Sequence, residues 1–159
     1  MADFPFADMV DFYFEDAVVG FKTYGYDHHV TEEEIIDFAK VWDPMPFHID
    51  VGQANKSIFG GLTASGAHVY SIFNKLCHNQ DRKMAIIAAL GVKEMSFDNP
   101  VRPGDTLHLE GECISSRESA SKKDRGICEF LFKLINQNGE IVFKLVQPVM
   151  IAKKANADA

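Results

Sequence analysis

The sequence has few cysteines, no long apolar run and no excess of positive charge. Its three cysteines are an odd number without metal-site spacing, which favours reduced thiols in a cytoplasmic protein. No apolar stretch approaches the roughly 20 residues that span a bilayer, so we expect no membrane segment. The first six residues contain an acid and no basic residue, so we expect no secretory signal.

The formal net charge of -7 disfavours nucleic acid as a partner, because phosphate binding needs a concentrated basic surface. A small anionic ligand is compatible with that charge, since a few local lysines or arginines suffice. The chain has 159 residues and shows no internal repeat, low-complexity tract or linker. We therefore predict a single domain over residues 1–159, with its core between about residues 20 and 152.

The first half of the chain is typical of a strand followed by helices. Residues 20–30 alternate and are rich in aromatic and branched types, which indicates a strand. Thr31 and Glu34 form the pattern of a capping box, in which each side chain binds the other residue's backbone amide. The helix that starts there has an expected buried face of Ile35, Phe38, Ala39 and Trp42. Gly60-Gly61 is expected to open a longer helix that packs closely on a sheet, because small residues follow it.

The second half is predicted to be mostly strand. Apolar or alternating runs over residues 84–97 precede a segment dense in turn residues. Three longer strands are expected over roughly 106–117, 126–135 and 140–152, with Asn138-Gly139 as a hairpin turn between the last two. A strand, helices and an antiparallel meander predict an α+β fold in which the sheet wraps around one central helix.

Asp43 and His48 are the strongest candidates for chemistry. They lie five residues apart in a run with two prolines, which disfavour regular helix and stiffen the backbone. A carboxylate and an imidazole on a rigid turn can share one water molecule, as general acid/base catalysis requires. The apolar neighbours Trp42 and Phe47 favour this interpretation. The plain alternative is an aspartate that caps a helix beside a histidine without a catalytic role.

Gly61 is a candidate for stabilising negative charge on a substrate oxygen. If Gly60-Gly61 begins the central helix, free amide groups and the positive end of the helix dipole face that oxygen. The alternative is a plain helix start in which glycine permits tight packing. Among the other histidines, we expect His28 and His29 to be exposed and His68 to be structural. No histidine and carboxylate cluster has ligand spacing, so no metal is expected.

Three sequence blocks resemble those of the MaoC-like acyl dehydratases, a family close to the (R)-specific enoyl-CoA hydratases. The blocks read Asp-Pro-Met-Pro-Phe-His-Ile-Asp from residue 43, Phe-Gly-Gly-Leu-Thr-Ala-Ser-Gly from residue 59 and Pro-Val-Arg-Pro-Gly-Asp-Thr-Leu from residue 100. They follow the family's order at compatible spacing. The resemblance covers about Gly20 to Ile151 and implies a hot-dog fold, an antiparallel sheet wrapped around a central helix.

The resemblance also implies an activity, the reversible addition of water to a 2-enoyl-CoA thioester to give a 3-hydroxyacyl-CoA. It places the catalytic pair on Asp43 and His48 and the oxyanion-binding glycine on Gly61. Around them we expect substrate contacts from Met45, Phe47, Phe59, Gly60 and Ser65. No cofactor is implied, because coenzyme A is part of the substrate. Family members are dimers or dimers of dimers, so we expect a homodimer that covers an open sheet edge.

The chain departs from the hydratase pattern Gly-Asp-x-Asn-Pro-x-His at two positions. Trp42 replaces the glycine, and Met45 replaces the asparagine that helps to order the hydratase site. Relatives carry a similar proline-rich version, so we expect the reaction class to be kept. Two alternatives stay open: a hot-dog thioesterase, in which water attacks the thioester carbonyl, and an acyl-CoA-binding module without catalysis. The sequence does not indicate the acyl group.

Overall fold

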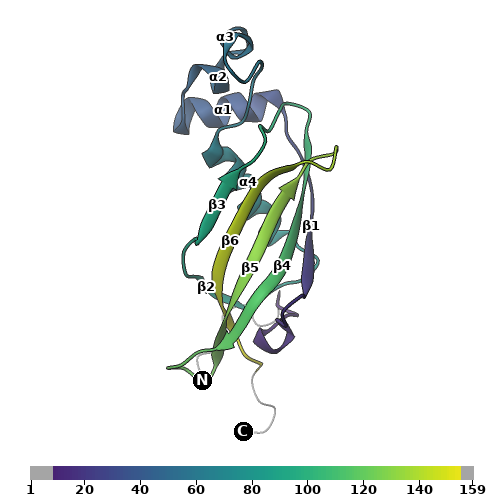
Figure 1. The fold of residues 1–159 in the computed structure, drawn as a ribbon, viewed down its shortest axis with the longest axis vertical. Helices are drawn as coiled ribbons and strands as arrows, with labels where there is room; N and C mark the ends of the chain where they lie inside the picture. The colour runs from purple at the N-terminus through teal and green to yellow at the C-terminus, as the bar shows by residue number, and fades with distance from the viewer. Residues whose placement is uncertain (1–8, 155–159) are drawn as a thin grey trace.

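The computed structural model describes residues 9–154 and contains one antiparallel sheet with helices on one face and at one end (Figure 1). The helices are α1 (Glu32–Trp42), α2 (Pro46–Ile49), α3 (Val51–Lys56) and α4 (Gly66–His78), and a 3-10 turn spans Phe14–Asp16. The strands are β1 (Lys22–His29), β2 (Ile86–Ala89), β3 (Glu94–Phe97), β4 (Thr106–Glu118), β5 (Arg125–Ile135) and β6 (Ile141–Ala152). The predicted α+β class is confirmed. Within the described residues, no helix is both long and apolar enough to cross a bilayer.

The sheet has the strand order β1-β4-β5-β6-β2, and β3 also pairs with β6. One edge is therefore β1, and the other is shared by the short strands β2 and β3. The predicted hairpin between β5 and β6 is confirmed, since Gly139 adopts a φ of 78° there and its amide donates to the Asn136 carbonyl. Buried and half-buried residues alternate along β5, as expected for a strand with one face in the core.

The central helix α4 lies against one face of the sheet (Figure 1). The Phe73 ring, on α4, packs against Phe132 and Phe143 with centroid separations of 5.2 and 5.6 Å. The helix approaches the sheet closely at its start, where a Cβ on Gly66 would lie 2.9 Å from the Phe97 ring. The prediction of a sheet wrapped around a closely packed helix is therefore confirmed.

The predicted start of this helix is wrong. The helix begins at Gly66, with Ser65 as its N-cap, and not at Gly60-Gly61. Residues 60–65 form no regular helix, because the carbonyls of Gly61 and Leu62 accept hydrogen bonds from a distant arginine. Glycine also has a low intrinsic helix propensity, so nothing local opposes this conformation.

Two predictions for the α1–α2 region are also corrected. Ile35 and Ala39 are buried as expected, but Trp42 is 71% exposed. It is the last residue of α1, and α1 to α3 project beyond the end of the sheet (Figure 1). The run after Asp43 is not wholly irregular either, since α2 begins at Pro46 and contains His48. Proline suits the first position of a helix because that residue's amide has no helical partner.

The cysteines pack into the structure as free thiols. Cys113 and Cys128 are fully buried, and burial raises the pKa of the Cys113 thiol to about 11. Burial also raises the pKa of Cys77 to about 12. Thiols with raised pKa values stay protonated near neutral pH, so these side chains act as packing groups.

Candidate active site

The side chains of Asp43 and His48 converge. Asp43 is the C-cap of α1, where its amide donates to the Ala39 carbonyl at 2.9 Å. The chain then reverses, with the Met45 amide donating to the Asp43 carbonyl at 2.8 Å, and α2 starts. As a result, His48 Nε2 lies 3.8 Å from Asp43 Oδ2. The stiff turn predicted from the two prolines therefore brings the two groups within reach of each other.

A backbone contact fixes which His48 nitrogen carries the hydrogen. Nδ1 lies 2.6 Å from the Thr63 carbonyl oxygen, and a carbonyl can only accept, so Nδ1 donates. In the neutral ring Nε2 then presents a lone pair to the Asp43 carboxylate. Two acceptors 3.8 Å apart do not bond to each other, but each can accept one hydrogen of the same water molecule.

The environment of the pair is buried on one side and open on the other. His48 is 7% exposed, and the Phe47 ring packs edge-on against the imidazole at 4.5 Å. The Asp43 side chain is 39% exposed. The carboxylate is therefore the accessible side of the pair, while protein atoms cover the imidazole.

The loop with the predicted oxyanion glycine passes beside His48. The Thr63 amide donates to the Phe47 carbonyl at 3.3 Å, and Thr63 is also the residue that holds the imidazole. Just before it, the amides of Gly61 and Leu62 donate no hydrogen bond within residues 9–154. These donors belong to an extended loop rather than to a helix end, so the predicted contribution of the helix dipole at Gly61 is not supported.

Of the five expected substrate contacts, Met45, Phe47 and Phe59 lie around the pair, and Gly60 follows Phe59 in the chain. Phe47 and Phe59 pack together with ring centroids 5.0 Å apart, Met45 is half exposed, and Gly60 is exposed with a φ of 60°. Ser65 differs, because it is fully buried and its hydroxyl accepts from the His68 amide at 3.2 Å as the N-cap of α4. The catalytic and substrate-binding roles of all these residues stay predictions.

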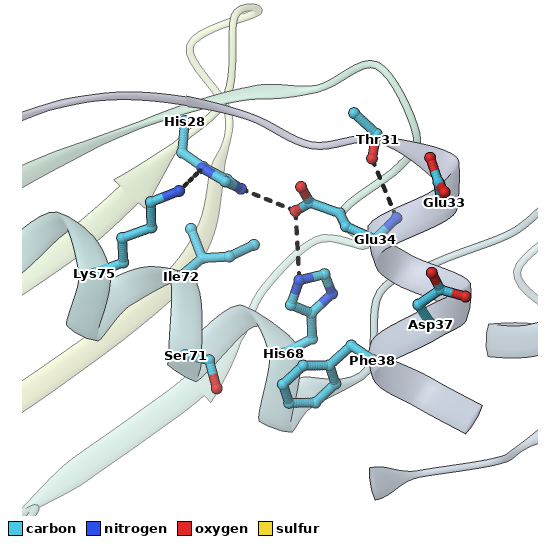
Figure 2. Close-up of a pocket in the computed structure, with 10 residues that line it drawn as sticks. All are labelled: His28, Thr31, Glu33, Glu34, Asp37, Phe38, His68, Ser71, Ile72 and Lys75. Atoms are coloured by element: carbon cyan, nitrogen blue, oxygen red, sulfur yellow. Dashed lines mark hydrogen bonds and ion pairs between the residues drawn. The ribbon is translucent and has the colours of Figure 1, made fainter. Parts of the chain in front are cut away.

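The sequence did not indicate a second polar cluster between β1, α1 and α4 (Figure 2). Glu34 Oε1 accepts from His28 Nε2 at 2.8 Å and lies 3.4 Å from His68 Nε2. Lys75 donates to His28 Nδ1 at 3.1 Å. The capping-box prediction is thus only half right: Thr31 accepts from the Glu34 amide, but the Glu34 carboxylate binds histidines instead of reaching back. His28 was expected to be exposed and is largely buried.

A cavity of about 570 Å³ lies over this cluster. Its lining residues come from β1, α1 and α4, including Phe38 and Ile72, and neither Asp43 nor His48 is among them (Figure 2). This cavity and the Asp43–His48 pair are therefore two separate sites.

The cluster predicts a loss of stability in mild acid. Burial lowers the pKa of His68, and the Glu34 carboxylate only partly offsets this. His28 and Lys75 are the other ionisable groups in contact with the cluster. As pH falls below about 6.5, the unfolded chain binds a proton that the folded His68 resists, so the free energy of unfolding decreases.

This decrease is at most about 1.4 kcal/mol per pH unit for one group. Urea unfolding at a series of pH values between neutral and mildly acidic measures it. A His68→Phe variant, which keeps the stack on Phe38, should show a shallower pH dependence than wild type. The exposed His78→Phe variant should keep the wild-type slope. Identical slopes for wild type and His68→Phe would contradict the assignment.

Comparison with known proteins relates most of the chain to one family. Residues 18–127 match the family described as MaoC like domain. The chain is 34% identical to the MaoC-like dehydratase from Rhodospirillum rubrum, whose structure superposes with a TM-score of 0.85 over 91% of this chain and 99% of that one. It is 30% identical to the uncharacterized protein YdeM of Bacillus subtilis (strain 168), over 78% of this chain and 87% of that protein.

More distant relatives extend the comparison. The (R)-hydratase from A. caviae is 26% identical, with a TM-score of 0.66 over 84% of this chain and 96% of that one. The chain spans only 34% of Protein MaoC of Klebsiella aerogenes and 22% of the mesaconyl-CoA hydratase of Cereibacter sphaeroides. A Mycobacterium tuberculosis protein with a double hot-dog fold superposes with a TM-score of 0.73 at 13% identity, over 92% of this chain and 46% of that one. The expected hot-dog fold is therefore confirmed.

Proposed function

This chain belongs to the MaoC-like domain family, and we propose that it catalyses the reversible addition of water to a 2-enoyl-CoA thioester. The observation that carries the proposal is the approach of His48 Nε2 to Asp43 Oδ2 at 3.8 Å, beside a loop with two free amides. The likeness to the (R)-hydratase from A. caviae supports the same reaction class.

In the proposed reaction, Asp43 and His48 bind one water through its two hydrogens. The water oxygen bonds to C3 of the substrate while His48 Nε2 takes one of its protons. The electron pair of the C2–C3 double bond moves onto the thioester, whose oxygen gains negative charge. When the thioester carbonyl re-forms, the electron pair at C2 takes the proton from the imidazolium, and the 3-hydroxyacyl thioester results. Asp43 accepts a hydrogen bond from the second hydrogen of the water, which stays on the oxygen as the new 3-hydroxyl group, and its carboxylate stabilises the imidazolium between the two steps.

The amides of Gly61 and Leu62 are the proposed donors to the thioester oxygen. Backbone amides aimed at a developing oxyanion act without reorganisation, and one such donor contributes about 3–4 kcal/mol in well-studied enzymes. No cofactor takes part in this scheme, and coenzyme A enters only as part of the substrate. The absence of a cofactor and the role of coenzyme A stay predictions.

A spectrophotometric panel tests the proposal. Purified protein is mixed with 2-enoyl-CoA thioesters of graded chain length, and loss of the conjugated absorbance is followed together with release of free thiol. Loss of absorbance without thiol release supports hydration and identifies the acyl group. Thiol release without change at C3 would indicate a thioesterase, and binding without turnover a non-catalytic module.

We further propose that the chain forms a homodimer through the β2–β3 edge. This edge carries apolar side chains that are half exposed or nearly so: Ile86, Ile87, Leu90, Val92, Met95 and Phe97. An exposed apolar edge strand readily pairs with another chain. Pairing two such edges about a twofold axis would cover both rows of side chains.

Changing Met95 to Lys tests this interface. Met95 lies on β3 and is 50% exposed, so a charge there should leave the fold intact and disfavour pairing. We expect the dimer dissociation constant to rise by about tenfold or more, as measured by light scattering over a dilution series. Tyr26→Lys, on the opposite edge strand β1, should leave it unchanged. A monomeric wild type at micromolar concentration would refute the proposed dimer.

A further inference from the structure

Arg102 binds three backbone carbonyls of the loop that carries the free amides. Its Nη1 donates to the Gly61 carbonyl at 2.8 Å and to the Leu62 carbonyl at 3.2 Å. Its Nη2 donates to the Phe59 carbonyl. One guanidinium, from the turn between β3 and β4, therefore holds a glycine-rich segment that has no helical or sheet hydrogen bonds of its own.

The arginine is itself held in place. Its amide donates to Asp105 Oδ2 at 2.7 Å, and Asp105 Oδ1 accepts from Gln137 at 2.9 Å. Asp105 is buried, so these bonds are shielded from water. One residue earlier, the Val101 carbonyl accepts from the Ala64 amide at 2.9 Å. The turn and the loop thus form one hydrogen-bonded unit rather than two mobile segments.

Holding the carbonyls also fixes the amides. The C=O and N–H groups of a trans peptide point in opposite directions, and all described peptide bonds are trans. With the Leu62 carbonyl on Arg102, the Thr63 amide points away from the guanidinium, and it does donate to Phe47 in the segment of His48. With the Gly61 carbonyl on Arg102, the free Leu62 amide points away in the same manner.

The positive charge adds to this geometry. A hydrogen bond from a charged donor polarises the peptide that accepts it, which strengthens the N–H of the same peptide as a donor. The peptide between Gly61 and Leu62 is in this position. Glycine suits residue 61, since a Cβ there would lie 3.2 Å from Arg102 Nη1 and would require the guanidinium to shift by a few tenths of an ångström.

From these contacts we propose that Arg102 is the positioning residue that orients and polarises the oxyanion-binding amide of Leu62, through its bond to the Gly61 carbonyl. The inference rests on the proposed hydration activity and adds to it a residue that never touches the substrate. Lysine cannot replace it, because a single ammonium group lacks the planar fork that reaches three carbonyls at once.

The test compares Arg102→Lys with Arg125→Lys. Arg125 is paired with Asp124 at the turn between β4 and β5, at the opposite end of the sheet from α1 (Figure 1). For hydration of the best enoyl-CoA substrate, Arg102→Lys should lower kcat by about ten- to a hundredfold, with KM changed by less than about threefold. Arg125→Lys should match wild type. In Arg102→Ala, added guanidinium ion should restore part of the kcat, whereas ammonium ion at the same concentration should not.

Each outcome decides the matter. A folded Arg102→Lys variant with wild-type kcat would overturn the inference, and so would an equal rescue by ammonium. Circular dichroism that shows Arg102→Lys to be unfolded would assign the residue to folding instead and would overturn it too. A wild-type protein that hydrates no enoyl-CoA would contradict the proposed function and the inference that rests on it. An active wild type together with a fully active Arg102→Lys variant would contradict the inference alone.

Discussion

Asp43→Asn and His48→Gln are each expected to lower kcat for enoyl-CoA hydration by roughly a hundred- to ten-thousandfold, with little change in KM. An Asn at position 43 still offers an acceptor oxygen but cannot balance an imidazolium 3.8 Å away. A Gln at position 48 can still donate to the Thr63 carbonyl but has no group that takes a proton from water. Steady-state kinetics with the best substrate of the panel measures both effects.

Matched variants separate chemistry from folding. Asp37→Asn makes the same change on the exposed side of α1, and His78→Gln makes it at the exposed end of α4. Both should keep wild-type kcat, and all four variants should have the wild-type circular dichroism spectrum. Full activity in both Asp43→Asn and His48→Gln would show that the reaction takes place elsewhere.

Phe73→Ala is expected to lower the free energy of unfolding by about 3–5 kcal/mol. The ring is 1% exposed and fills the space between α4 and the sheet, where it meets Phe132 and Phe143. Removing it loses the transfer free energy of the ring and leaves a cavity that a helix packed this tightly cannot close. Urea unfolding monitored by circular dichroism measures the change.

The control for this effect is an aromatic ring outside the core. Tyr26 on β1 is 70% exposed, so Tyr26→Ala should change the free energy of unfolding by no more than about 0.5 kcal/mol. A Phe73→Ala effect as small as that of Tyr26→Ala would mean that α4 does not hold the sheet in the way the structure indicates.

The sequence predicted those features that depend on neighbouring residues. Alternation along residues 126–135 gives β5 because a strand with one face in the core repeats every two residues. Asn138-Gly139 predicts the turn because this kind of turn needs a residue with a positive φ, which Gly139 adopts. The two prolines after Asp43 stop α1, and this brings the candidate pair together.

The features that it missed depend on partners far away in the chain. Gly60-Gly61 does not start α4, because Arg102 takes the carbonyls that a helix would use. The Glu34 carboxylate does not complete the capping box, because two histidines from other elements bind it. Trp42 has the right spacing for the buried face, but it is 71% exposed, because α1 projects beyond the end of the sheet (Figure 1). Local pattern carries no information on such contacts.

The reaction of the best enoyl-CoA substrate in water enriched in the heavy isotope of oxygen tests the central claim most directly, with mass spectrometry of the products. If Asp43 and His48 deliver water to C3, the product is an intact CoA thioester with the label in its 3-hydroxyl group, and the Asp43→Asn and His48→Gln variants form almost none of it. A label in the carboxylate of a released acid, together with free coenzyme A, would contradict the account.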